Sequence, residues 1–395
     1  MTAPTVGTPR RTGLGTALAG MLLIAATYGL ARFGVGLFAP YLAAERPELT
    51  AALGWAAAAQ FTSYCLAAVV AARLVGRSPR TGLLLAGATA TTGCLGVAVT
   101  SDPVVFVVAV FVGGMAGGFA SPALVAIIDA VVAPEATATA QSVTNAGTAV
   151  GVIGAGLLAL AAPSIGPAWM FMALMCAVAT AAAWCPARAR TGPAAPRSSA
   201  SGPPPVPPRG AWQSLLLPGA AAVIVGAGSS LTWTFGPLLV TGSGSVAPER
   251  VGWLWIALGL GGFLGTLAGG LVERTGQRGG WCTCAGVLAL AGAGVALAVA
   301  TGSSWAAYTS MAVFGAGYMG LTAVLILWAR RAWPDHAGEG TSILFIALAT
   351  GQALGSVGFG TAQGLRSPVL LATLAAGLCA AGGLAVLRRE RQLSR

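Results

Sequence analysis

The sequence lacks lysine altogether, has one histidine and ten acidic residues, and only 8% of its 395 residues are charged. A soluble globular domain carries about 25% charged residues. So few charged side chains cannot cover two or three soluble domains in water, which excludes a soluble enzyme. The scarcity also excludes a nucleic-acid-binding protein, despite the net charge of +11, because such a protein needs Lys and Arg clustered on a folded polar face.

The chain is instead rich in apolar residues and glycine. Hydrophobic types make up 56% of the chain, 58 residues are Gly, and the mean hydropathy is +0.81. Small residues let membrane helices approach one another closely. The composition therefore predicts an all-α integral membrane protein in direct contact with a lipid bilayer.

The cysteines and the one histidine do not form a metal site. All seven Cys lie in or beside apolar segments, and His336 is the only His. Cys282 and Cys284 are spaced too closely for a C-x-x-C redox motif. We predict that the cysteines are small apolar packing residues, and we expect no metal, no cofactor and no catalytic residue.

Twelve segments are long and apolar enough to cross a bilayer, which takes about 20 residues of helix. They are residues 14–42, 51–74, 81–100, 104–132, 137–162, 166–186, 212–240, 250–272, 280–300, 304–329, 339–364 and 368–387.

One connection differs from the short turns elsewhere. Between residues 193 and 208 the chain has seven Pro and no apolar periodicity, a composition typical of a solvated linker. It divides the chain into a tail (1–13), a first six-helix bundle (14–187), a linker (188–211), a second six-helix bundle (212–387) and a second tail (388–395).

The arginines predict the orientation, because loops rich in Arg stay cytoplasmic. With the N-terminus inside, 17 of the 21 Arg fall in inside segments, three fall in outside loops, and Arg32 lies within the first span. Both termini and the linker are therefore predicted to be cytoplasmic. The positive net charge is then explained by this orientation and by contact with anionic lipid.

The two halves repeat each other at an offset near 198. The segment FAPYL at 38–42 corresponds to FGPLL at 235–239, Gly29 corresponds to Gly226, and Gly151 corresponds to Gly351. Ordered matches across several spans indicate a duplicated six-helix unit in parallel orientation.

The loop after the eighth predicted span carries a motif that resembles that of a known family. Residues 269–278 read GGLVERTGQR, which resembles the G-x-x-x-D/E-R-x-G-x-R loop motif of the major facilitator superfamily. In the first half the corresponding motif is degraded, with Val75 at the acidic position. The Arg-Phe pair in the first span also resembles a poorly characterised bacterial branch of this superfamily.

The resemblance implies a fold and an activity. It implies two parallel six-helix bundles in a bacterial inner membrane, acting as a monomeric secondary transporter by alternating access. It also implies that Glu273, Arg274 and Arg278 make charge contacts across the cytoplasmic face that hold the outward-open state, with Gly269 and Gly276 completing the motif. An ordinary basic loop is the alternative.

Arg32 is the most informative single residue. It lies about 6 Å from the centre of the first span at 1.5 Å per residue, a depth tolerated only toward a bundle interior or a water-filled cavity. Asp129 is the only candidate for a buried acidic partner, but it lies about 18 Å to the cytoplasmic side of the centre of its span, so we do not expect it to pair with Arg32. Arg32 could bind an anionic substrate group, pin backbone groups between the halves, or extend toward the outer face.

Other polar residues near the midplane are candidates for substrate binding. Several lie on the spans that line the cavity in transporters of this superfamily, and helix-to-helix hydrogen bonding is the alternative for each. The candidates are Tyr28, Gln60, Tyr64, Asn145, Ser230, Trp233, Tyr318 and Gln352.

The sequence thus predicts a carrier of a small organic solute, with export favoured over uptake by the resemblance. Uptake or exchange of small organic anions through Arg32 is an alternative, and so is a membrane receptor on the same scaffold. No Asp or Glu lies near the midplane of a span. Coupling therefore either runs through cytoplasmic-side groups such as Asp129, or the solute carries the proton itself or is exchanged for a counter-solute.

Overall fold

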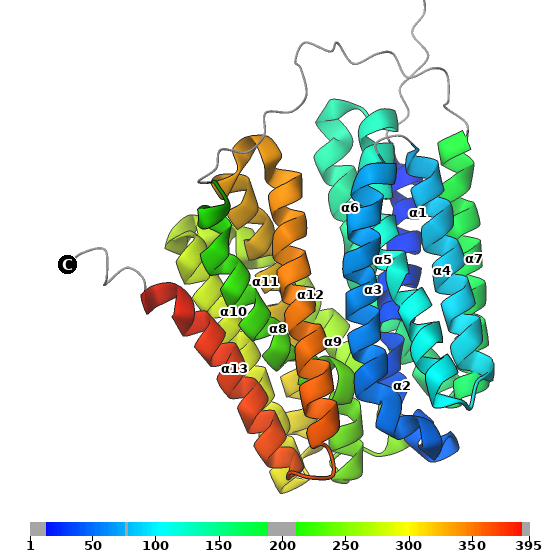
Figure 1. Cartoon of the computed structure of the whole chain (residues 1–395), viewed down its shortest axis with the longest axis vertical. Coiled ribbons are helices and arrows are strands. Elements are labelled where there is room, and N and C mark those ends of the chain that lie inside the picture. The colour runs from blue at the N-terminus through cyan, green and yellow to red at the C-terminus, as the bar shows by residue number, and fades with distance from the viewer. Residues whose placement is uncertain (1–12, 76–77, 189–210, 389–395) are drawn as a thin grey trace, which may run out of the picture.

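A computed structural model describes residues 13–75, 78–188 and 211–388 of the chain, and the described part contains helices and turns without strands. The predicted tails except residues 13 and 388, and the predicted linker except residues 188 and 211, lie outside the described residues. The helices run nearly parallel to one another in two groups (Figure 1).

The first group begins with a span made of three pieces. Its elements are α1 (Leu14–Ile24), the π-helical η1 (Ala25–Arg32), α2 (Gly34–Glu45), η2 (Pro47–Ala52), α3 (Leu53–Leu74), α4 (Pro79–Val99), α5 (Pro103–Val131), α6 (Pro134–Ala161) and α7 (Ile165–Arg188).

The second group follows the linker. Its elements are α8 (Ala211–Gly242), η3 (Pro248–Arg250), α9 (Gly252–Leu264), η4 (Gly265–Leu267), α10 (Ala268–Thr301), α11 (Ser304–Ala332), η5 (Pro334–His336), α12 (Ala337–Ala362) and α13 (Pro368–Arg388). Pro opens several of these helices because its ring fits the first helical turn, where no intrahelical N–H bond is needed.

Eleven of the described helices are long and apolar enough to cross a membrane. The one remaining predicted span, the eighth (250–272), is divided among α9, η4 and the start of α10. Its first part, α9, is short, and α10 continues beyond the predicted end. Inside α10, Gly276 has φ 72° and ψ 173°, which is not helical. A Cβ placed on Gly280 would lie 2.7 Å from the Val272 side chain, so the chain doubles back at Gly276. Residues before it complete the eighth span, and residues after it form the ninth.

The structure confirms the internal repeat through equivalent close contacts. Gly29 of η1 lies against the backbone of Gly151 on α6, and Gly226 of α8 lies against Leu348 and Gly351 on α12. In both places a Cβ would meet backbone atoms, so the glycines allow the first and fifth helices of each bundle to touch. The all-α fold of two parallel six-helix bundles is therefore as predicted.

The bundles meet at one end of the molecule. We call the end where α7 finishes and α8 begins the linker end, and the opposite one the far end; the linker end is uppermost in Figure 1. Toward the far end, Gly156 of α6 touches Gly252 of α9, and Gly54 of α3 touches Gly360 of α12. The Tyr41 hydroxyl also donates to the Pro248 carbonyl across the interface, at 2.9 Å.

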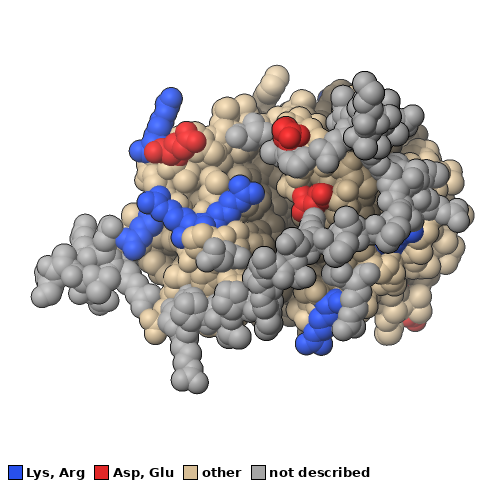
Figure 2. Space-filling model, turned by 90° about the horizontal axis from the view of Figure 1, so that it is seen from above, with Lys and Arg blue, Asp and Glu red and all other residues tan. Residues whose placement is uncertain are grey.

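Toward the linker end the same helix faces separate. Ala149 of α6 still contacts Gly259 of α9. One helical turn closer to the linker end, Asn145 of α6 and Phe263 of α9 are both exposed. Ala72 and Ser342 continue the faces of α3 and α12 in the same direction, and both are exposed. Seen from the linker end, the surface is hollowed between the two bundles (Figure 2).

Candidate functional site

A break in the first span positions Arg32. Residues 25–32 form π-helix, and the Phe33 amide donates to the Tyr28 carbonyl at 3.2 Å, five residues back. Single π-turns inside helices shift the side chains that follow them and are frequent at functional sites. Here the π-helix ends at Arg32. Arg32 and Phe33 therefore lie at the depth where the two bundles begin to separate.

Four aromatic rings surround the Arg32 guanidinium. Its central carbon lies 4.2 Å from the ring centroid of Tyr64, 5.4 Å from those of Tyr28 and Phe61, and 5.6 Å from that of Phe33. Each ring is within the range of about 6 Å over which a cation is attracted to an aromatic ring. We call these four rings the aromatic cage.

The cage supplies no hydrogen-bond acceptor to Arg32. The side chain is 6% exposed, yet it forms no hydrogen bond or ion pair with any described residue, and its Nε is fully enclosed without an acceptor. The Tyr28 hydroxyl is already used: it donates to the Gly117 carbonyl at 3.0 Å and lies 2.9 Å from Ser121 Oγ. Asp129 accepts a hydrogen bond from Gln141 Nε2 at 3.2 Å instead.

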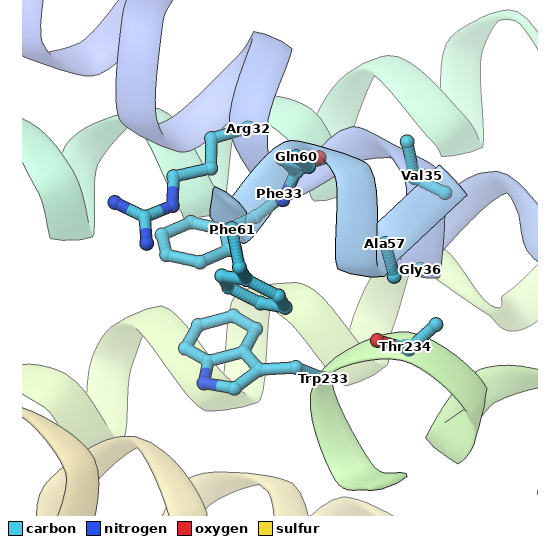
Figure 3. Close-up of a pocket in the computed structure, with 9 residues that line it drawn as sticks. All are labelled: Arg32, Phe33, Val35, Gly36, Ala57, Gln60, Phe61, Trp233 and Thr234. Carbon is cyan, nitrogen blue, oxygen red and sulfur yellow. The ribbon is translucent and has the colours of Figure 1, made fainter. Parts of the chain in front are cut away.

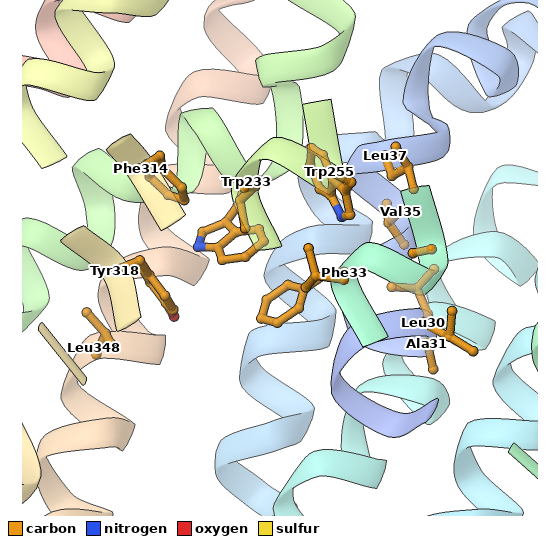
Figure 4. Close-up of a cluster of buried hydrophobic side chains, with 14 of the residues drawn as sticks. Leu30, Ala31, Phe33, Val35, Leu37, Trp233, Trp255, Phe314, Tyr318 and Leu348 are labelled. Carbon is orange, nitrogen blue, oxygen red and sulfur yellow. The ribbon is translucent and has the colours of Figure 1, made fainter. Parts of the chain in front are cut away.

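The second bundle contributes Trp233. Its ring stacks on Phe33 at 4.0 Å between centroids and 12° between planes, which joins the first and seventh spans. Trp255, Phe314 and Tyr318 pack edge-on against Trp233 (Figure 4). The Trp233 Nε1 is buried and has no acceptor among the described residues, as is also true of Trp169 and Trp255.

Little space is left between Arg32 and Trp233. An enclosed cavity of about 10 Å³ is lined by both residues together with Gln60, Phe61 and Thr234, which is near the lower limit for one water molecule. Figure 3 shows the guanidinium group pointing away from Val35 and Ala57, beside the Phe33 ring. The far-end side of Arg32 is therefore closed.

Seven predicted residues fall in or beside this cluster, and two do not. Tyr28, Arg32, Gln60, Tyr64 and Trp233 lie around the guanidinium or the small cavity.

Gln352 and Tyr318 form a pair next to Trp233, with Gln352 Nε2 donating to the Tyr318 hydroxyl at 3.1 Å. Ser230 is fully buried, faces Gly355 and donates to the Ala227 carbonyl. Asn145 lies exposed on α6, nearer the linker end.

Sequence reasoning missed two members of the cage, Phe33 and Phe61. Phe33 was visible as the second residue of the Arg-Phe pair. Phe61 lies three residues before Tyr64 and one after Gln60, so helical spacing places it beside both predicted residues.

The predicted gating loop lies at the linker end. Gly276 takes the conformation that lets α10 double back, whereas Gly269 is helical and a Cβ added to it would meet nothing within 4 Å. Glu273 and Arg274 are exposed, and Arg278 lines a pocket of about 560 Å³ with Gln277 and Arg331. Arg331 Nη1 donates to Gln277 Oε1 at 3.1 Å.

Comparison with known proteins agrees with the architecture. The family model described as Major Facilitator Superfamily matches residues 21–356. The crystal structure of nucleoside transporter NupG is 12% identical, with a TM-score of 0.76, covering 96% of this chain and 98% of that one. A mutant of peptide transporter POT is 12% identical, with a TM-score of 0.73, covering 99% of this chain and 96% of that one. No curated protein matches the chain in sequence.

Proposed function

We propose, because this chain belongs to the Major Facilitator Superfamily, that it exports a small organic solute across a bacterial inner membrane by alternating access. The family assigns it to the membrane transporters and not to the enzymes. The solute would bind where the first and seventh spans meet, between the aromatic cage of Arg32 and the Trp233–Tyr318–Gln352 cluster.

One observation carries this proposal. The bundles pack through Gly54, Gly156, Gly252 and Gly360 toward the far end, while their facing helices separate toward the linker end. The Arg32 cluster lies where the packing stops. A site reached from one side only, between two repeat-related bundles, is what rocking of one bundle against the other requires.

The proposed direction of transport, export, comes from the family resemblance, and the orientation is proposed from the arginines. Because the inside segments carry 17 of the 21 Arg, we propose that the linker end is cytoplasmic. The hollow then faces the cytoplasm, which is the side from which an exported solute would be loaded. We further propose that the loop containing Glu273, Arg274 and Arg278 contributes to closing this end, and that the carrier acts as a monomer.

The energy source is a separate part of the proposal. No Asp or Glu contacts the Arg32 cluster among the described residues, so the protein offers no carboxylate there for proton coupling. We propose that a proton bound to the solute itself, or a counter-solute, drives the cycle.

Reconstitution tests the proposal. The purified chain is first screened for thermal stabilisation by organic acids, amines and neutral compounds, and each stabilising compound is then tested for counterflow in liposomes. We expect at least one stabilising compound to exchange across the membrane at rates above those of protein-free liposomes. Stabilisation without any counterflow would contradict transport and favour a receptor on the same scaffold.

A further inference from the structure

Arg32 is a buried cation that has aromatic faces around it and no anion. We propose that the solute carries an oxyanion, a carboxylate or a phosphate-type group, which Arg32 binds through its two terminal nitrogens. This inference rests on the proposed transport function and names the chemical class of its solute.

The donors of Arg32 are available for a ligand. Its Nε is enclosed, whereas Nη1 and Nη2 have no hydrogen-bond partner among the described residues and are not sealed from solvent. Arg32 is more than nine-tenths buried, so only a small part of its donor edge is open to solvent. The aromatic cage surrounds the guanidinium with rings within 5.6 Å of its central carbon and supplies no acceptor for its N–H groups. Two parallel N–H donors on a fixed plane fit the two oxygens of a carboxylate or phosphate.

The surroundings favour an acceptor with negative charge. A cationic solute would be repelled by Arg32, and no carboxylate of the described chain lies near enough to screen that charge. A second buried donor, Trp233 Nε1, also lacks an acceptor in the same cluster. The Tyr28 hydroxyl is bonded to Gly117 and Ser121, and the Tyr318 hydroxyl accepts from Gln352, so neither supplies a counter-charge.

The cage explains how Arg32 stays in place when no solute is bound. Attraction to four rings partly replaces the water that the cation loses on burial. The ring of Tyr64 is the nearest, at 4.2 Å. The face of this ring, and not its hydroxyl, is what the cation contacts. Tyr64→Phe should therefore preserve anion binding, and Tyr64→Leu should weaken it by releasing the guanidinium.

The test uses small probes, so that the identity of the solute is not needed. The full chain is purified in lipid nanodiscs, and tryptophan fluorescence is titrated with acetate, with inorganic phosphate, with uncharged acetamide, and with chloride at matched ionic strength. We expect a saturable change with acetate or phosphate and none with acetamide or chloride. Saturation by acetate alone indicates a carboxylate solute, and saturation by phosphate indicates a phosphate-type one.

Variants assign the effect to Arg32. Arg32→Lys keeps the charge but loses the paired donors, so binding should weaken about tenfold; Arg32→Gln should weaken it by about tenfold to a hundredfold. A saturable change of equal affinity in folded Arg32→Gln, or none with either anion in the wild-type chain, would overturn the inference. Transport of a neutral solute by Arg32→Gln at the wild-type rate would overturn it as well, while leaving the proposed transport function intact.

Discussion

Adding one methyl group at the far-end interface should change which end of the protein is open. Gly156 of α6 lies so close to α9 that a Cβ on it would be 2.5 Å from the Gly252 carbonyl oxygen. Ordinary contact begins near 3.4 Å. Gly156→Ala therefore requires the two helices to move apart by about 1 Å, or the far end to open.

The size of the effect follows from the packing. Forcing a methyl group into a close-packed interface costs about 1–3 kcal/mol, and each 1.4 kcal/mol changes a population ratio about tenfold. The cost falls on the state in which the far end is closed. Gly156→Ala should thus raise the population open at the far end by roughly fivefold to 150-fold.

Gly154 offers a matched control two residues away on the same helix. A Cβ on Gly154 meets nothing within 4 Å, so Gly154→Ala gains the same helix propensity without touching α9. Spin labels at Ala51 and Arg366, which are exposed on the two bundles at the far end, report the opening as a longer distance. Identical distance distributions for Gly156→Ala and Gly154→Ala would refute the reasoning.

Three further predictions concern the loop after the eighth span and the orientation. Gly276→Ala should lower the free energy of unfolding by about 1–3 kcal/mol, because the backbone conformation of Gly276 is nearly restricted to glycine. Gly270→Ala is the control, since a Cβ there meets nothing within 4 Å. Equal melting temperatures for the two variants would contradict this prediction. Glu273→Gln should slow transport without loss of stability, since exposed ion pairs contribute only ~0–1 kcal/mol; unchanged kinetics would reduce the motif to a basic loop. A Cys at Ser199, outside the described residues, should react with an impermeant thiol reagent only from the cytoplasmic side; labelling from the other side would overturn the orientation.

The architecture was predictable because membrane helices are recognisable by length and composition. The repeat was visible in residues such as Gly151 and Gly351, which the structure places at equivalent helix contacts. The eighth and ninth spans were harder to delimit. The helix breaks at Gly276 because of the backbone conformation of this one residue. Hydropathy and composition cannot predict such a break.

The candidate site was predictable in part. Depth alone identified Arg32, since a charge in mid-span must face the interior. The direction in which the other candidate side chains point depends on how each helix is rotated about its axis, which the sequence does not give. Ser230, for example, faces Gly355 and not the Arg32 cluster. The π-helix that ends at Arg32 has no recognised sequence pattern, and without it the positions of Phe33 and the rest of the aromatic cage could not be derived.

The central claim is that the two bundles rock around the Arg32 cluster. Its most direct test measures two distances in the same reconstituted protein, one between spin labels at Arg73 and Glu339 at the linker end, the other between labels at Ala51 and Arg366 at the far end. All four positions are exposed. Adding a transported solute should shorten the first distance and lengthen the second in a matching fraction of molecules. Two distances that stay fixed, or that change in the same direction, would contradict alternating access.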